Sequence, residues 1–267
     1  MTRLAIIFSL LATSALAQTE AAPDSSPIPP ARPDSLTDET PAAEAEGEEE
    51  GELETMPGAT PTEAEEAVPE AEPVFRAVAS SYPEHAACLE ELEEIGASFE
   101  EIEMVTEEDD RDCGILRPIE LTEVLPGVTL EPAGTMRCET ALALARWTRD
   151  HVRPSVAELP DSPEVTGLTN ASSYVCRRRV GDPQEQPSEH SFGNAIDISA
   201  IELEGADPLP IQNRNGDADL LEAVQRATRA AGCLFYTTVL GPGTDPAHDD
   251  HFHFDVAERR GNYRICQ

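Results

Sequence analysis

The sequence predicts an α+β domain in which a small, mainly antiparallel sheet carries helices on one side. Between residues 84 and 256, segments with helical spacing of apolar residues are interspersed with segments in which every second residue is apolar. All six cysteines lie between residues 88 and 266. An even number of cysteines in an exported chain is typical of a fold stabilised by disulfides.

Three helices are predicted from apolar residues spaced three and four positions apart. The first covers residues 84–95 and is expected to stop at Gly96. The second covers residues 140–152 and contains the single tryptophan, Trp147, which we expect in the core. The third covers residues 217–231, where leucine, valine and alanine fall on one face.

The strands are predicted from alternating patterns and from β-branched and aromatic residues. Two short strands are expected on either side of a turn at Pro126-Gly127. With these two, the predicted strands lie within residues 98–104, 115–130, 172–179, 195–201, 234–240 and 251–256.

The N-terminal part is expected to be processed and then unfolded. Arg3 precedes a short apolar run that ends in an Ala-x-Ala pattern, which predicts a signal peptide over residues 1–17. Residues 18–78 are predicted to be a disordered, acidic, proline-rich linker. Within residues 18–75, 17 acidic residues accompany one arginine, which gives a net charge of −16. A segment with low hydrophobicity and such a high charge cannot offset the entropy cost of ordering the chain. The folded domain is therefore expected over residues 79–267.

The charge balance limits the classes of partner. From residue 76 onward, 36 acidic residues outnumber 16 arginines, which argues against nucleic acid and anionic membranes. After the predicted signal peptide, no apolar stretch is long enough to cross a bilayer, so no membrane span is predicted. Nothing in the sequence predicts an oligomer. We expect a periplasmic or secreted protein of a Gram-negative bacterium.

The cysteines are expected to form three disulfides, because none lies in a Cys-x-x-Cys pair typical of zinc ribbons or redox motifs. Six cysteines allow 15 connectivities, and the sequence alone does not choose among them. We expect Cys88 to pair with Cys113, because the loop between them is short.

Four of the six histidines lie in two short segments that also contain aspartate. One segment runs Ser-Glu-His-Ser-Phe-Gly-Asn-Ala-Ile-Asp over residues 188–197, and the other runs His-Asp-Asp-His-Phe-His over residues 248–253. His190, Asp197 and His253 can supply three protein ligands to zinc and leave a fourth position for water. That composition is typical of a catalytic zinc site rather than a closed structural one. The alternative is a hydrogen-bonded polar cluster on a sheet.

Strand periodicity supports this grouping. In a strand over residues 251–255, His251, His253 and Asp255 point to one face, and the two phenylalanines between them point to the core. Asp255 is therefore a candidate for a carboxylate that orients an imidazole.

Hydrolysis at such a site needs a base and a group that stabilises the oxyanion. His251 and His248 are candidates for the base. Arg177 is the candidate for the oxyanion, with Arg178 and Arg179 as alternatives. The three consecutive arginines are equally suited to forming ion pairs with acidic residues on the surface.

The two segments resemble the signature of the lysostaphin, D-alanyl-D-alanine metallopeptidase and hedgehog-type zinc fold. The pattern Ser-x-His-x-x-Gly-x-Ala-x-Asp, followed at a distance by His-x-His, carries this resemblance. It implies that fold, with zinc bound by His190, Asp197 and His253. The His-x-x-His-x-His spacing is also similar to that of the penicillin-insensitive murein endopeptidase, which implies that His248 and His251 assist catalysis without binding the metal. Relatives with a carboxylate base carry it at the position of Asp250.

A second resemblance covers nearly all of residues 84–267 and is to the bacterial extensin-like C-terminal domain family. Tyr174 and Arg177 are separated by two residues, whereas many peptidase relatives have an adjacent Tyr-Arg pair. The similar segments are residues 138–147, 173–177, 188–197, 233–235, 239–242 and 248–255, with the terminal Cys266.

Together, the residues and the resemblance lead us to expect an exported zinc metallopeptidase that hydrolyses peptide bonds in peptidoglycan, in either stem peptides or cross-links. The alternative is a non-catalytic cell-wall or protein-binding module that contains zinc. A disulfide-stabilised adaptor without metal is a third possibility.

Overall fold

The computed structural model describes residues 71–267 except residues 185, 215 and 217. The predicted signal peptide over residues 1–17, and the predicted linker as far as residue 70, lie outside the described residues. None of the described helices is both long and apolar enough to cross a membrane.

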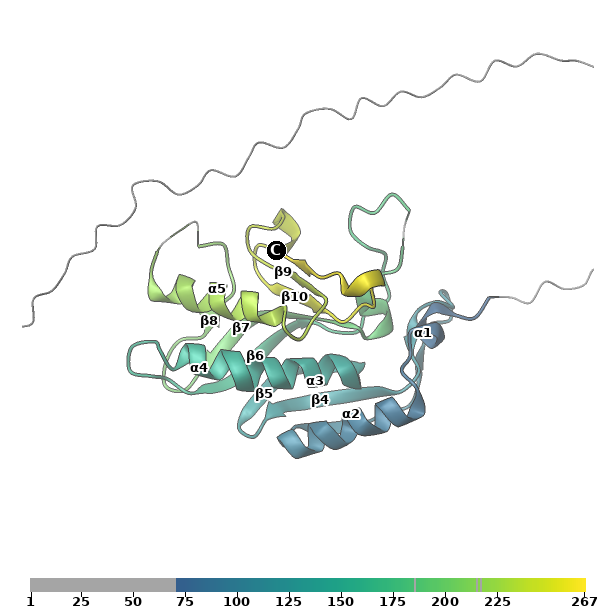
Figure 1. Ribbon diagram of the computed structural model, residues 1–267, viewed down its shortest axis with the longest axis horizontal. Coiled ribbons are helices and arrows are strands. Elements are labelled where there is room, and N and C mark those ends of the chain that lie inside the picture. The colour runs from purple at the N-terminus through teal and green to yellow at the C-terminus, as the bar shows by residue number, and fades with distance from the viewer. Residues whose placement is uncertain (1–70, 185, 215, 217) are drawn as a thin grey trace, which may run out of the picture. The chain divides into compact units, whose positions relative to one another are not determined.

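The sheet has nine strands in mixed orientation and carries helices on one face (Figure 1). Its strand order is β1-β4-β5-β6-β7-β10-β9-β11, and β8 pairs with β7. The β5–β6 and β9–β11 pairs are parallel, and the other pairs of this sheet are antiparallel. A separate two-stranded sheet joins β2 and β3. The strands are β1 (Ser98–Glu101), β2 (Val105–Thr106), β3 (Gly114–Ile115), β4 (Pro118–Leu125), β5 (Val128–Arg137), β6 (Val165–Ser172), β7 (Ala195–Leu203), β8 (Leu209–Pro210), β9 (Thr238–Leu240), β10 (Phe252–Asp255) and β11 (Ile265–Cys266).

Three helices cover that face: α2 (Tyr82–Ile95), α3 (Cys138–Trp147) and α5 (Leu220–Gly232). The helix α2 begins at a capping box, in which Ser81 and Glu84 bond each other's backbone, and it ends at Gly96 in the left-handed conformation. Asp219 caps α5 by accepting a hydrogen bond from the backbone N–H of Glu222. After α3 the chain continues through a π-helical turn over Thr148–Val152 into the short helix α4 (Arg153–Val156).

The core lies between these helices and the sheet. Trp147 of α3 is fully buried and contacts Phe252 and Phe254 of β10 edge-on. Tyr236 stacks on Phe254, with ring centroids 4.8 Å apart. The two phenylalanines of β10 therefore face the helices, and the alternate residues of that strand face away from them.

The predicted α+β class, the sheet with its mainly antiparallel pairing and the three disulfides are confirmed. The strand expected within residues 172–179 is wrong, because the strand in that region is β6, which ends at Ser172. Residues 175–179 instead bond the 186–190 segment, for example through the N–H of Arg179 and the carbonyl of Gln186. The sequence did not predict β6, because Gly167 and Asn170 weaken its strand pattern.

The expected Cys88–Cys113 disulfide is wrong. The disulfides are Cys88–Cys138, Cys113–Cys176 and Cys233–Cys266. The expectation was based on the short loop between these two cysteines, but tertiary packing determines which cysteines lie close enough to pair. Cys88 lies on α2 against the first residue of α3, whereas Cys113 lies beside β3 at the segment that follows β6.

Helical structure is already present before the expected boundary at residue 79. Residues Val74–Ala77 form the short helix α1, and Phe75 is buried. The backbone N–H of Val74 donates to the Asp112 carboxylate. The last residues of the predicted linker thus belong to the folded domain.

Candidate metal centre

The first segment with a candidate metal ligand is a 3₁₀ turn over Glu189–Phe192 that ends at Gly193. Gly193 has a φ of +68°, and a Cβ on this residue would lie 2.4 Å from Cδ1 of Ile115. Its carbonyl accepts hydrogen bonds from the N–H of Arg137 and the hydroxyl of Thr140. Only glycine combines this backbone with this close approach, so Gly193 fixes the turn that buries His190 completely.

The segment after β6 sets the orientation of the His190 ring. The carbonyl of Ser173 lies 2.6 Å from Nδ1 of His190 and can accept a hydrogen bond there. With the proton of a neutral ring on Nδ1, Nε2 carries the lone pair that a metal requires.

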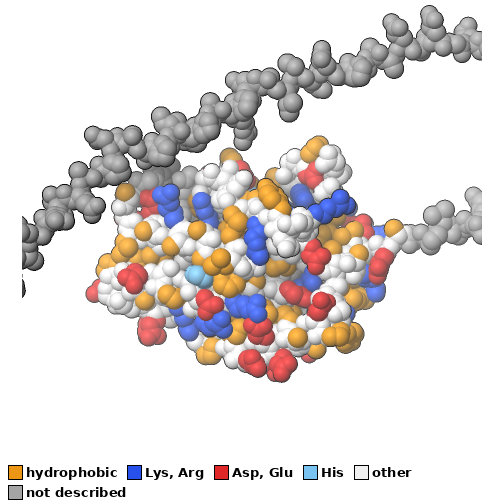
Figure 2. Space-filling view, viewed as in Figure 1, with side chains coloured by type: hydrophobic (Ala, Val, Ile, Leu, Met, Phe, Trp, Pro, Cys, Tyr) orange, Lys and Arg blue, Asp and Glu red, His pale blue; other side chains and the backbone are white. Residues whose placement is uncertain are grey.

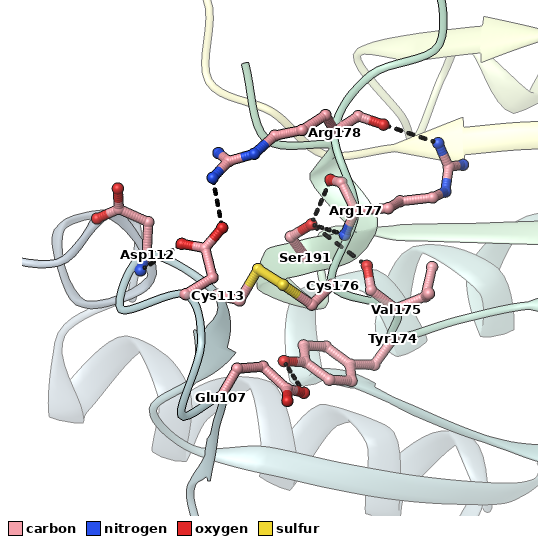
Figure 3. The surroundings of a disulfide bond; sticks show 10 residues. Glu107, Asp112, Cys113, Tyr174, Val175, Cys176, Arg177, Arg178 and Ser191 are labelled. Carbon is pink, nitrogen blue, oxygen red and sulfur yellow. Dashed lines mark hydrogen bonds and ion pairs between the residues drawn. A yellow bond between two sulfur atoms is a disulfide. The ribbon is translucent and has the colours of Figure 1, made fainter. Parts of the chain in front are cut away.

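Two further links hold that segment against the turn (Figure 3). The hydroxyl of Ser191 accepts from the N–H of Arg177 at 3.0 Å and lies 2.9 Å from the Arg177 carbonyl. The Cys113–Cys176 disulfide joins the same segment to the strand pair β2–β3, and Arg178 forms an ion pair with Asp110 (Figure 3). The backbone segment that positions His190 is therefore held both by the turn and by the region around β2–β3.

The remaining two residues meet through strand register. β7 and β10 are antiparallel, and Asp197 lies directly opposite His253. Side chains of opposite residues lie on the same face of a sheet, which here is the face away from Trp147. A one-residue shift in either strand would separate the pair.

The three side chains converge closely. Nδ1 of His253 lies 2.9 Å from Oδ1 of Asp197 and 3.2 Å from Nε2 of His190, and Nε2 of His190 lies 3.3 Å from the same Asp197 oxygen. Two ligand atoms each about 2.0–2.1 Å from a tetrahedral zinc lie about 3.3 Å apart. These separations fit the donor set of a zinc ion, and they equally fit hydrogen bonds.

The charges of this cluster are strongly coupled. Burial on its own lowers the pKa of His253, but contacts with Asp197 and Asp255 outweigh it and raise this pKa to about 9. Burial on its own raises the pKa of Asp197, but contacts with His190 and His253 hold it well below its usual range. Without a metal, the site therefore contains a protonated His253 between two carboxylates at neutral pH.

Asp255 lies where strand alternation places it. One of its oxygens lies 3.4 Å from Nε2 of His253, and the other accepts from the N–H of Ala257. The Arg259 guanidinium lies 3.6 Å from the second oxygen. Asp255 can therefore fix the His253 ring with Nδ1 directed at Asp197.

His251 and His248 lie at the edge of the cluster. Nε2 of His251 is 3.8 Å from Oδ1 of Asp197, and the His248 ring lies 5.3 Å from the His251 ring and 5.8 Å from the His253 ring. Each of the two uses Nδ1 to contact a carboxylate, Asp250 for His251 and Asp245 for His248, at 2.8 Å in both cases. Because Nδ1 is occupied in each ring, Nε2 is the nitrogen through which either ring would transfer a proton.

The sequence interpretation missed the role of Asp245. This residue caps the 3₁₀ turn over Pro246–His248, where aspartate followed by proline is a recognisable start signal. Asp250, considered as a base, has a carboxylate 87% exposed and bonded to its neighbour His251. The Asp250 carboxylate is therefore placed to orient the His251 ring rather than to contact the three candidate ligands.

Arg177 makes no contact with the cluster among the described residues. Within the described part of the chain its contacts are with Ser188, Ser191 and Arg178, and its side chain is exposed. The Tyr174 hydroxyl donates a hydrogen bond to Glu107, on the far side of the same segment (Figure 3).

Comparison with known proteins gives one kind of match. No curated protein and no solved structure matches the chain. Residues 86–267, which include all six cysteines and the whole histidine cluster, match the family described as extensin-like protein C-terminus. On that match over most of its length, the chain belongs to the extensin-like protein C-terminus family.

Proposed function

We propose that this protein is an exported zinc metallopeptidase that hydrolyses peptide bonds in peptidoglycan. The observation that carries the proposal is the group of buried His190 and Asp197 with half-buried His253, whose ligand atoms all lie within 4.8 Å of one another. One carboxylate and two imidazoles make a typical catalytic zinc set, and three protein ligands leave a fourth position for water. Three disulfides without a free cysteine among the described residues are typical of an oxidising compartment, such as the periplasm.

A bound zinc would supply an acidified water and polarise the scissile carbonyl. The chain's own residues would handle the protons. His251 is the first choice of base, because Asp250 occupies its Nδ1 and its Nε2 lies 3.8 Å from Oδ1 of Asp197. His248, held in the same way by Asp245, would assist.

The finer fold assignment belongs to the same proposal. The spacing of the two segments resembles the lysostaphin, D-alanyl-D-alanine metallopeptidase and hedgehog-type zinc fold, in which the metal lies on a sheet. The opposition of Asp197 and His253 across β7 and β10 supports this likeness. The choice of peptidoglycan, rather than another peptide, comes from that resemblance.

The second candidate is a zinc-containing module that binds wall components without cleaving them. The exposed position of Arg177 favours it, because the cation that the sequence suggested for the oxyanion makes no described contact with the three candidate ligands. A fold can retain a metal site without the reaction.

Metal analysis and a cleavage assay separate these readings. Purified protein should contain about one zinc per chain, lost in Asp197→Ala and retained in the control His151→Ala, whose ring packs on Phe235 outside the cluster. Incubation with purified peptidoglycan should release fragments identifiable by mass, and His251→Ala should slow release by about 10²–10⁴-fold. Zinc without fragments supports the binding module, and a native protein without zinc contradicts both.

A further inference from the structure

A cavity of about 560 Å³ lies beside α5. Its lining comes from one face of that helix, from the loop that follows β9 and from the segment that follows β8. The candidate zinc ligands and the two histidines beside them do not line it, so it is distinct from the candidate metal centre. Its size falls within the usual range of small-molecule sites, about 300–1,000 Å³.

The lining has an excess of positive charge. Both oxygens of the Glu222 carboxylate are engaged, one by the Arg226 guanidinium at 3.1 Å and the other by the N–H of Ala218. Arg214 and Arg229 form no ion pair among the described residues, and their printed partners are neutral oxygens. Two cations of this wall therefore have no paired carboxylate in the described part of the chain. The charged residues of the lining are Arg214, Glu222, Arg226 and Arg229.

Arg214 is built into the wall of the cavity. The residue is only 9% exposed. Its Nε donates to the side-chain oxygen of Gln225, and its Nη2 donates to the carbonyl of Pro210. Its Nη1 has no partner in the described structure, and it is not one of the polar atoms that are closed to solvent. A buried guanidinium therefore keeps one accessible, unused donor in this wall.

Arg229 is held in place by the loop after β9. Its Nη1 donates to the carbonyl of Pro242 at 2.6 Å, and a Cβ on Gly241 would lie 2.7 Å from its Cδ. Nε and Nη2 have no partner within the described residues and are not closed to solvent. Burial lowers the pKa of Arg229, and the neighbouring Arg226 lowers it further. An anion in the cavity would relieve both effects.

An apolar cavity of about 450 Å³ adjoins the first one. Arg226, Arg229 and Gln267 line both cavities, so the two meet along α5. A small aliphatic group could be buried there, next to the guanidinium of Arg229. The other lining residues of this second cavity are Ala227, Ala230, Cys233, Val239 and Cys266.

We propose that the two joined cavities bind the terminal carboxylate of a peptide whose last side chain is small and apolar. The carboxylate would accept from the unused nitrogens of Arg229, and Arg214 adds a second cation and donor to the same cavity. The aliphatic side chain would occupy the second cavity. A phosphate would satisfy the arginines but would leave the apolar cavity unused. The site contains none of the candidate zinc ligands and does not depend on the proposed peptidase activity.

The test uses the ¹⁵N-labelled protein and three small probes. N-acetyl-valine has the carboxylate and the side chain, N-acetyl-valine amide lacks the charge, and N-acetyl-glycine lacks the side chain. N-acetyl-valine should shift the amide signals of Gln225, Ala230 and Thr244 saturably. It should bind at least about tenfold more tightly than the amide and about threefold more tightly than N-acetyl-glycine. The uncharged chelator 1,10-phenanthroline should leave this binding unchanged, because the site needs no metal.

Two substitutions of arginine by glutamine locate the site. Arg229→Gln should weaken binding of N-acetyl-valine about tenfold or more. Arg153→Gln is the matched control, because Arg153 is also half-buried and also donates to a backbone carbonyl, that of Pro126, but lines neither cavity. If Arg229→Gln fails to fold, Ala230→Phe, at an exposed position on the second cavity, should fold and weaken N-acetyl-valine to the level of N-acetyl-glycine.

The outcomes that overturn the proposal are distinct. Equal binding of the amide, or unchanged binding to Arg229→Gln or Ala230→Phe, would show that the carboxylate or the cavity is not recognised. Inorganic phosphate that binds as tightly as N-acetyl-valine would show a general anion site. The acidic run Glu48-Glu49-Glu50 is a rival source of carboxylates within the chain. Movement of its amide signals in Arg229→Gln without any probe would assign the cavity to that run instead.

Discussion

His253 has a carboxylate near each ring nitrogen, so the proposed binding of zinc would be coupled to the release of a proton. With a pKa of about 9, the ring is protonated at pH 7 in the metal-free protein. Because zinc requires the neutral imidazole, binding at pH 7 should release about one proton from this residue. Calorimetry in buffers of different ionisation enthalpy measures that number. The release should disappear near pH 10, and a buffer-independent enthalpy at pH 7 would contradict the assignment of His253 as a ligand.

Gly193 offers a test of how the turn positions His190. Alanine at this position must adopt a positive φ and also displace Ile115, so Gly193→Ala should lower the free energy of unfolding by about 2–4 kcal/mol and weaken zinc binding. Gly127 is the matched control, since it also has a positive φ but its added Cβ meets nothing within 4 Å. Gly127→Ala should cost about 1 kcal/mol and leave zinc binding unchanged, measured by urea unfolding and metal titration. Equal effects of the two variants would show that the contact with Ile115 is unimportant.

At the scale of elements, two disulfides of similar chemistry have different neighbours. Cys113–Cys176 fastens the segment that orients His190, whereas Cys233–Cys266 joins the end of α5 to β11. Replacing either pair by serine should cost about 2–5 kcal/mol in the free energy of unfolding.

Zinc affinity should distinguish the two pairs. The double variant Cys113→Ser/Cys176→Ser should bind zinc at least about tenfold more weakly, because the Ser173 carbonyl is no longer held at Nδ1 of His190. Cys233→Ser/Cys266→Ser should keep the wild-type affinity under conditions where both variants are folded. A similar loss in both would mean that global stability, not local positioning, governs the site.

The sequence was informative about elements where periodicity is strong. The helices around Leu92, Trp147 and Val224 and the strand that carries His253 follow their apolar patterns. It failed at β6, where Gly167 packs against Thr129 of β5 and the pattern is interrupted. Disulfide pairing also escaped prediction, because it depends on tertiary packing. The proximity of the three candidate ligands followed from spacing, but the carboxylates beside His248 and His251 required the folded loop.

At the scale of the whole molecule, the N-terminal boundary of the folded region has a measurable consequence. Removing residues up to 78, the boundary expected from sequence, deletes α1 and the buried ring of Phe75. We expect a chain of residues 79–267 to be less stable than one of residues 66–267 by about 1.5–3 kcal/mol, the contribution of one buried aromatic side chain. Thermal and urea unfolding of the two fragments measure this difference. The variant Phe75→Ala in the longer fragment should reproduce most of it, and identical stability of all three would show that α1 contributes nothing.

Charged side chains of both signs are distributed over the surface of the folded domain on the face shown in Figure 2. On the face shown in Figure 2, arginine and acidic side chains are interspersed rather than gathered into a basic patch. The exclusion of nucleic acid as a partner, which rests on the net acidity of the chain, stays a prediction.

The four residues of β10 serve the core and the candidate site at once. Phe252 and Phe254 pack on Trp147, while His253 and Asp255 belong to the histidine cluster. A single-residue insertion or deletion within β10 would reverse both assignments together and place imidazole against tryptophan. We therefore expect β10 to tolerate substitutions but not insertions or deletions. Length variation within the family should be confined to the loops on either side of this strand.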